Sequence, residues 1–273
     1  MSQPTKIETL LQLLDDPNQQ AASLIMAELL ELENDLPEYL AALQESDNPI
    51  LRRRVHQLES VMFLRRRRRE FAERLCHDQI DLLDGLIEIH LQWYDNDSPD
   101  SIHADWDKLL KEAEKTPPEN LEKMAYFMRK TGFSSPQPND LQADYYCLGA
   151  VFDDNTGSDV LLCAICQLLA AHWGCELEII QVMENFALID KAKRVLTPKD
   201  GWRVHSPVQN EVYNVWDRTK VLKFAMSMLF LCAVSTDSFR YVNTIGGVLE
   251  KIYGLEGIDF LPFPYNQPFG GKK

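Results

Sequence analysis

Residues 155–175, NTGSDVLLCAICQLLAAHWGC, decide the fold of this chain. A turn sequence that ends at Gly157 precedes a run that is apolar on nearly every side, and Gly174 follows as a helix stop. A helix without a polar face has to lie inside a protein. We therefore expect residues 158–173 to form a buried central helix.

The segments around this helix set the fold class. Three strand-like runs follow it, at residues 177–183, 186–189 and 194–197, and a second apolar helix is expected over 215–234. The first half of the chain is typical of helices, including one long helical stretch over residues 65–91. The sequence thus predicts a helix-rich α+β protein with a small antiparallel sheet.

A repeated rhythm marks the first 75 residues. The phrases DDPN at residues 15–18 and DNP at residues 47–49 each interrupt leucine-rich helical segments, about one repeat length apart. Stacked helix pairs of the HEAT type show this rhythm, so residues 1–75 are expected to form a helical HEAT-like arm. Two copies are fewer than the roughly three that a free-standing solenoid needs, which predicts a cap rather than a solenoid.

Composition excludes several functions. The net charge of −14 and the pI of about 4.9 disfavour nucleic acid and anionic lipid as partners, since both need a basic surface. The most apolar run, residues 224–234, is shorter than the roughly 20 residues of a membrane span. The N-terminal residues lack the order of a secretion signal, and the six cysteines suggest no disulfide framework. A cytoplasmic protein with no membrane contact is the expectation.

The order of Gly turn, buried helix and strands resembles the SirB-type transglutaminase-like proteins of bacteria. The likeness rests on residues 155–175, on ENFALI at 184–189 and on LTPKDG at 196–201. The N-terminal phrases LLDDP and NPILRRR also resemble longer family members, so the resemblance spans residues 5–205. It implies a transglutaminase/papain-like core over residues 76–212. C-terminal helices and an extended Pro- and aromatic-rich tail would follow over residues 213–273.

The resemblance also assigns three site positions. In that family a Cys begins the buried helix as nucleophile, a His on the next strand activates it, and an Asp on the following strand orients the His. Here these positions fall on Asp159, Asn185 and Thr197. A carboxylate is a poor acyl-transfer nucleophile and neither Asn nor Thr shuttles protons near neutral pH. The resemblance therefore implies a degenerate, non-catalytic interaction or regulatory protein without cofactor or metal. Its protein or peptide partner is not specified, and an oligomer is left open.

A thiol enzyme is the alternative. An amidase or transglutaminase-like hydrolase could use Cys163 through a shifted alignment. That thiol would lie a turn inside an apolar helix, where burial raises a thiol pKa, and no His occurs between Trp173 and Arg203 to activate it. The spacing of Cys163 and Cys166 also suits half a zinc site or a redox pair, although small core fillers are the favoured interpretation.

Five consecutive arginines form the strongest charge run: Arg65, Arg66, Arg67, Arg68 and Arg69. They are the candidate partner patch, and a nucleic-acid-associated protein acting through this helix is the second alternative function. Consecutive helical residues point all round the helix, so the five side chains cannot share one ligand. Neighbouring carboxylates such as Glu70 favour a solvated, self-paired face instead.

Overall fold

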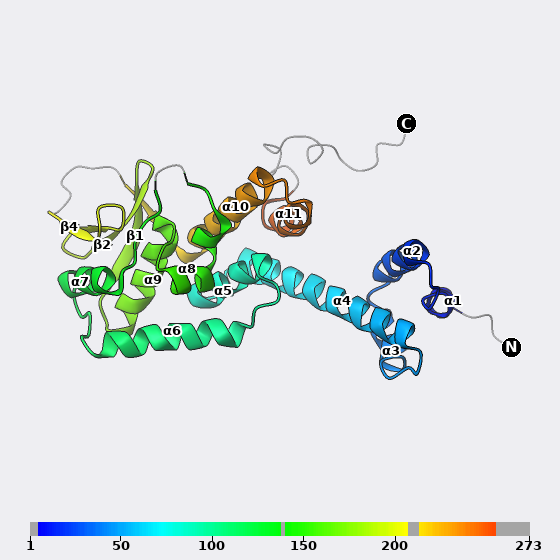
Figure 1. The fold of residues 1–273 in the computed structure, drawn as a ribbon. Helices are drawn as coiled ribbons and strands as arrows, with labels where there is room; N and C mark the ends of the chain where they lie inside the picture. Colours follow the sequence, from blue (N-terminus) through cyan, green and yellow to red (C-terminus); the bar gives the residue numbers. More distant parts are fainter. Residues whose placement is uncertain (1–4, 138–139, 207–212, 255–273) are drawn as a thin grey trace, which may run out of the picture. The chain divides into compact units, whose positions relative to one another are not determined.

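The computed structural model describes residues 5–137, 140–206 and 213–254, and the expected extended tail over residues 260–271 lies outside them. The chain divides into two compact units, which are Met1–Glu70 and Phe71–Lys273 (Figure 1). The helix-rich α+β class with a small antiparallel sheet is confirmed. None of the described helices combines the length and the apolar character that a bilayer crossing requires.

The first unit is made of helices only, as expected, within its described residues. They are α1 (Lys6–Gln12), α2 (Gln19–Leu30), α3 (Leu36–Ala41) and the first part of α4 (Pro49–Cys76). The repeated breaks in the sequence work as helix caps. Asn18 accepts hydrogen bonds from the first backbone N–H groups of α2, and Asn48 does the same for α4. The buried core of this unit is almost entirely leucine.

The buried Arg54 and the capping residue Asn48 both bind the segment around Asp15 and Asp16. Arg54 is only 2% exposed, and its guanidinium donates to the backbone carbonyls of Leu14 and Asp16. Asn48 also donates to the Asp15 carboxylate, at 3.2 Å. Leu14 and Asp16 belong to the segment that follows α1, so their carbonyls have no partner within a helix and a charged donor stabilises them. Arg54 of α4 and its cap Asn48 thus bind the segment that follows α1.

The helices of the second unit enclose one core. They comprise the end of α4, α5 (Leu82–Trp93), α6 (Pro99–Glu114), α7 (Leu121–Thr131), the 3₁₀ turn η1 (Ala143–Tyr146), α8 (Leu148–Asp154), α9 (Asp159–His172), α10 (Arg218–Ser235) and α11 (Phe239–Tyr253). Side chains of α10 and α11 belong to the same buried cluster as those of α5 and α9. The described C-terminal helices therefore complete this core.

The single helical stretch expected over residues 65–91 is wrong. Helix α4 ends at Cys76 and α5 begins at Leu82, because Asp78 adopts a left-handed backbone conformation with φ of 54°. The Asp78 carboxylate binds the start of α10, accepting from Arg218 Nε at 2.9 Å and from Thr219 Oγ1 at 2.6 Å. This contact, 140 residues away in sequence, stabilises a break that helical periodicity does not reveal.

The sheet has five antiparallel strands in the order β4-β3-β2-β1-β5. They are β1 (Leu177–Val182), β2 (Asn185–Asp190), β3 (Val195–Thr197), β4 (Arg203–His205) and β5 (Asn214–Trp216). The first three correspond to the expected strands. The apolar helix predicted over 215–234 begins later than expected. Its first residues belong to β5, and Asp217 then caps the N-terminus of α10.

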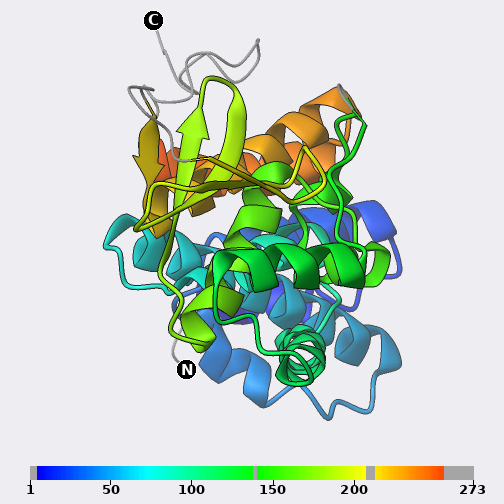
Figure 2. The same ribbon diagram turned by 90° about the vertical axis from the view of Figure 1, so that its left-hand side faces the viewer.

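Helix α9 lies against β1 and β2, so the sheet and its helices form adjacent layers (Figures 1 and 2). Ile179, Phe186 and Leu188 belong to the main core with α9, while the alternate residues Ile180 and Ala187 belong to a small cluster on the other face. The described side chains of α9 from Val160 to Cys166 are all buried, which confirms the central helix.

Candidate functional site

The three assigned positions lie at the same end of these layers. Asp159 is the first residue of α9, Asn185 is the first of β2, and Thr197 is the last of β3. The other end of α9 meets the start of β1, where Gln167 Nε2 donates to the carbonyl of Leu177 at 2.8 Å. Because β2 and β3 run antiparallel, the start of β2 and the end of β3 then fall beside the N-terminus of α9.

Lys199 is the centre of this cluster. Its ammonium donates to Asn185 Oδ1 at 2.7 Å. Burial raises the pKa of Asp159, and the Lys199 charge is one of two weaker influences that oppose this rise. Lys199 is therefore in direct contact with the position assigned to the base and acts on the position assigned to the nucleophile through its charge alone.

Asp159 has a half-buried carboxyl, and its neighbours influence its pKa in opposite directions. Burial raises its pKa above the ordinary value, and the negative charge of Asp200 acts in the same direction. A hydrogen bond from the Ser135 hydroxyl and the charge of Lys199 oppose that shift. The place at the start of α9 also favours a negative group through the helix dipole. These contacts bind the carboxyl firmly and make it a poor nucleophile.

A Thr–Asp–His group completes the cluster. Thr197 Oγ1 lies 3.0 Å from His205 Nε2 and 3.4 Å from Asp200 Oδ2, and that carboxylate oxygen is 3.3 Å from the same ring nitrogen. In a catalytic relay the acid must bind the ring nitrogen that the nucleophile does not use. Here hydroxyl and carboxylate share one nitrogen, so the three residues cannot act as a relay.

His205 is not among the residues that the sequence assigned to the site. It reaches Thr197 because β4 pairs with β3, with Thr197 opposite Arg203 and Val195 opposite His205. The available signal was the turn at Gly201, which has a positive φ of 65° and is followed by a short strand. A hairpin there puts His205 opposite Val195, from where its ring reaches Thr197, two residues further along β3.

The alternation of the strands separates the assigned positions. Asn185 and Thr197 alternate with Phe186 and Leu196, which pack in the main core, so they belong to the opposite face of the sheet. Among the described residues no hydrogen bond joins Asp159 to either of them: its hydrogen bond comes from Ser135, and Lys199 binds Asn185. The assignment of a degenerate triad to these positions stays a prediction.

The cysteines on α9 are core residues. Cys163 and Cys166 are fully buried, and burial raises the pKa of both thiols well above the ordinary value. No group of three His, Cys, Asp or Glu side chains within the described residues is placed to hold a metal ion. A thiolate nucleophile at Cys163 therefore has no support from its surroundings.

The arginine run pairs with the protein itself. Arg65 and Arg69 both approach Glu33, a side chain only 12% exposed that precedes α3. Arg66 pairs with Glu70 at 3.8 Å and lies over the ring of Phe63. These pairs follow from the helical spacing, which turns successive arginines to different neighbours. Arg65, Arg66 and Arg69 thus show the self-paired arrangement that the sequence favoured.

Comparisons with known proteins give no match to a family model, to a curated protein or to a solved structure.

Proposed function

We propose that this protein binds a peptide or small amide, without acyl-transfer chemistry, on a transglutaminase-like core whose catalytic positions hold Asp159, Asn185 and Thr197. The ligand would bind at the polar cluster beside the N-terminus of α9. On this proposal the protein is an interaction or regulatory protein.

One observation carries the proposal: the Lys199 ammonium that binds Asn185 and acts on Asp159. A transglutaminase-like site requires a thiolate and an imidazole in contact at this place. The cluster instead offers a cation, carboxylates and a hydroxyl. Such groups suit recognition of an amide, which presents one donor and one acceptor. The order of buried helix and antiparallel strands supports the scaffold part of the proposal.

The first experiment tests the absence of catalysis. The wild-type protein is incubated with a glutamine-containing peptide and a primary amine, and ammonia release is measured. We expect no release above that of buffer. Ammonia release that Cys163→Ala abolishes would establish the thiol-enzyme alternative instead. The Cys76→Ser variant is the control, because Cys76 is the exposed thiol.

The second experiment tests the scaffold. In a Cys76→Ser background, Asp159→Cys installs a thiol at the assigned nucleophile position, and Asn185→His is then added. If the proposed scaffold is right, a His at the start of β2 reaches the thiol although Asn185 belongs to the other face of the sheet. It should then speed alkylation by iodoacetamide several-fold, because an imidazole near a thiol favours the thiolate. Glu178→His, on exposed β1 surface at the far end of the sheet, is the matched control. Equal rates for the two double variants would show that the assigned positions do not face each other.

The third experiment tests binding. Short peptides containing glutamine or asparagine are titrated while the amide resonances of residues 155–160 and 196–205 are followed by NMR. We expect saturable shifts that Lys199→Met removes. Lys191→Met is the control, since Lys191 is an exposed lysine paired with Glu176 at 2.6 Å outside the cluster. Shifts that survive Lys199→Met would exclude this cluster as the binding site.

A further inference from the structure

A second feature of the molecule is a pocket whose lining residues all belong to the first unit. It is a groove of about 990 Å³ between α2 and the first three turns of α4. On α2 its lining residues, from Gln19 to Leu30, recur every three or four positions, and on α4 they recur in the same way from Pro49 to Val61. Each helix thus presents one continuous stripe, so the groove follows both helices for roughly 18 Å at 1.5 Å per residue.

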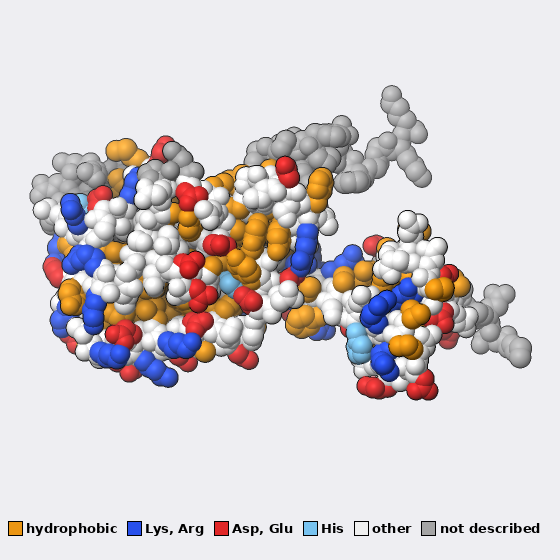
Figure 3. All heavy atoms as spheres, in the orientation of Figure 1, with side chains coloured by type: hydrophobic (Ala, Val, Ile, Leu, Met, Phe, Trp, Pro, Cys, Tyr) orange, Lys and Arg blue, Asp and Glu red, His pale blue; other side chains and the backbone are white. Residues whose placement is uncertain are grey.

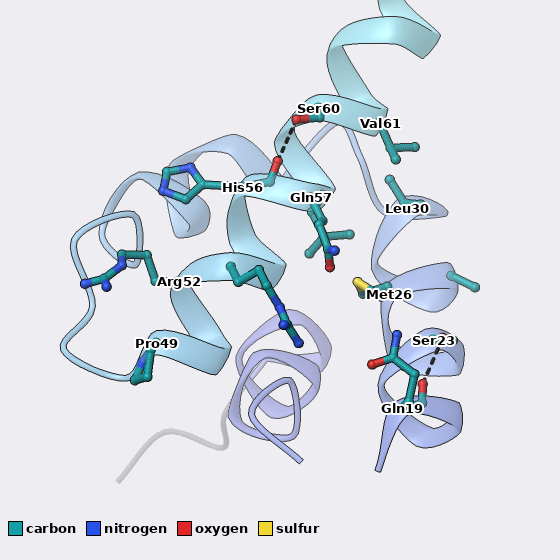
Figure 4. A pocket seen from close by; sticks show the side chains of 13 residues that line it. Gln19, Ser23, Met26, Leu30, Pro49, Arg52, His56, Gln57, Ser60 and Val61 are labelled. Atoms are coloured by element: carbon teal, nitrogen blue, oxygen red, sulfur yellow. Dashed lines mark hydrogen bonds between the residues drawn. The ribbon is translucent and has the colours of Figure 1, made fainter. Parts of the chain in front are cut away.

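The groove has an apolar side and a basic side. Figure 4 shows Met26, Leu30 and Val61 on one side, with Arg52 and His56 on the other. Val61 is 39% exposed although it is aliphatic, so the apolar side is open to a partner. The serines of the lining bind their own helices, Ser23 to the carbonyl of Gln19 and Ser60 to that of His56, each at 2.8 Å. Because these hydroxyls are already bonded, a partner would be recognised mainly by apolar contact and by charge.

The charge of the groove is opposite to that of the protein. Arg52 and Arg53 line it, and no Asp or Glu does, although the chain as a whole has a net charge of −14. Two carboxylates close to lining residues in sequence have partners: Glu59 accepts a hydrogen bond from Gln44 Nε2, and Glu28 pairs with Lys6 at 3.1 Å. Figure 3 shows basic and hydrophobic side chains next to one another on the visible face of this unit. An acidic partner would be attracted here and repelled by most other surfaces.

We propose that this groove binds an acidic amphipathic helix of a partner protein. The apolar stripe of that helix would contact Met26, Leu30 and Val61, with anchors at positions i, i+3 or i+4, and i+7. Its flanking carboxylates would pair with Arg52 and Arg53. A nucleic acid fits less well, because only two arginines line the groove and its other wall is apolar.

The test uses the full chain and two synthetic peptides of about 12 residues, which is the length that spans the groove at 1.5 Å per residue. Both peptides carry leucines at i, i+3, i+4 and i+7. One has glutamates at the flanking positions and the other has lysines. Binding is measured by fluorescence anisotropy at low and at moderate salt. We expect saturable micromolar binding of the glutamate peptide, weaker at higher salt, and no comparable binding of the lysine peptide.

Variants locate the binding site. Arg53→Glu should weaken binding of the glutamate peptide by about tenfold or more, since it replaces an attraction by a repulsion. Met26→Glu should do the same through the apolar wall. Lys191→Glu, on an exposed lysine of the second unit, is the control for net charge. Circular dichroism checks that each variant is folded, and any misfolded variant is replaced by Arg52→Glu or Val61→Glu.

Three results would overturn the proposal. The two peptides could bind equally well, or Arg53→Glu could leave the affinity of the glutamate peptide unchanged. The groove could also prove to be covered by a second copy of this chain. In that case sedimentation would show a dimer that Arg53→Glu dissociates and that the glutamate peptide does not.

Discussion

Gly85 of α5 faces Leu222 of α10 so closely that a β-carbon at position 85 would overlap the leucine side chain. Both residues are buried. The glycine thus sets the distance between two helices of the main core. We expect Gly85→Ala to lower the free energy of unfolding by about 1–3 kcal/mol, as overpacking does, measured by urea denaturation.

Gly247 of α11 is the matched control. An added β-carbon there meets no atom within 4 Å, and the residue lies inside a helix. Alanine has the higher helix propensity, so Gly247→Ala should raise the free energy of unfolding by about 0.5–1 kcal/mol. If Gly85→Ala raised the free energy of unfolding as Gly247→Ala does, the close approach at Gly85 would be contradicted.

Arg54 should be essential to the first unit. Arg54→Met removes the donor to two backbone carbonyls in the segment that follows α1 and leaves them unsatisfied. We expect hydrogen exchange of the amides of α1 in the full chain to report a loss of about 2–4 kcal/mol in the free energy of opening. The same substitution at exposed Arg53 should cost less than about 0.5 kcal/mol. Equal protection in the two variants would contradict the role given to Arg54.

Glu33 should stabilise α4 through its ion pairs with Arg65 and Arg69. Glu33→Gln leaves Arg65 and Arg69 without their shared carboxylate, and we expect a cost of about 1–3 kcal/mol in the opening of α4 because the group is mostly buried. Glu70→Gln breaks an exposed pair and should cost under about 0.5 kcal/mol. The wild-type chain should show no salt-dependent binding of duplex DNA. Tight, salt-sensitive binding would restore the nucleic-acid alternative.

His90 should make stability depend on pH. Burial lowers its pKa below the ordinary value of 6.5, even though Asp97 raises it through a hydrogen bond. As the pH falls below 6.5, the His90 imidazole therefore becomes protonated more readily in the unfolded chain than in the folded chain. The free energy of unfolding is then greatest above pH 6.5 and falls as the pH drops below that value.

The His90→Gln variant tests this slope. Urea denaturation between pH 5 and pH 7.5 should show a smaller loss on acidification than in the wild type, whatever the variant costs at neutral pH. His103→Gln, on the exposed surface of α6, is the control and should keep the wild-type slope. An unchanged slope in His90→Gln would mean that other groups cause the pH dependence.

The thiols should react with iodoacetamide in the order of their exposure. Cys76 is exposed, whereas Cys147, Cys163 and Cys166 are buried with raised pKa values. In the native protein we expect Cys76 to be alkylated first and the buried three only on unfolding, as followed by mass spectrometry of the peptides. Alkylation of Cys163 as fast as that of Cys76 would contradict this order.

The sequence predicted those helices and strands whose formation depends on residues close to one another in the chain. Asn18 and Asn48 cap helices where the breaks suggested helix starts, and the apolar stretch that ends near Gly174 is a buried helix. The strands with strong aliphatic content were also expected. These features depend on neighbouring residues or on plain burial, so the chain reveals them without knowledge of the fold.

The missed features depend on distant partners. Strands β4 and β5 have three residues each and exist because β3 and β1 pair with them. The end of α4 requires the contact between Asp78 and Arg218. His205 joins the cluster only through the β3–β4 pairing, and Lys199 bridges Asn185 through its long side chain. No periodicity in the sequence records such pairings.

The strand order also has a consequence for synthesis on the ribosome. Strands β1, β2 and β3 each pair with the next strand in the chain, so the part from β1 to β4 can form soon after each strand emerges. Strand β5 pairs with β1, whose outer edge stays open until residues 214–216 have been made and α10 can follow. An open strand edge is a template for pairing with other chains. A nascent chain that stalls before residue 214 would therefore be prone to aggregation, and completion of β5 and α10 protects it.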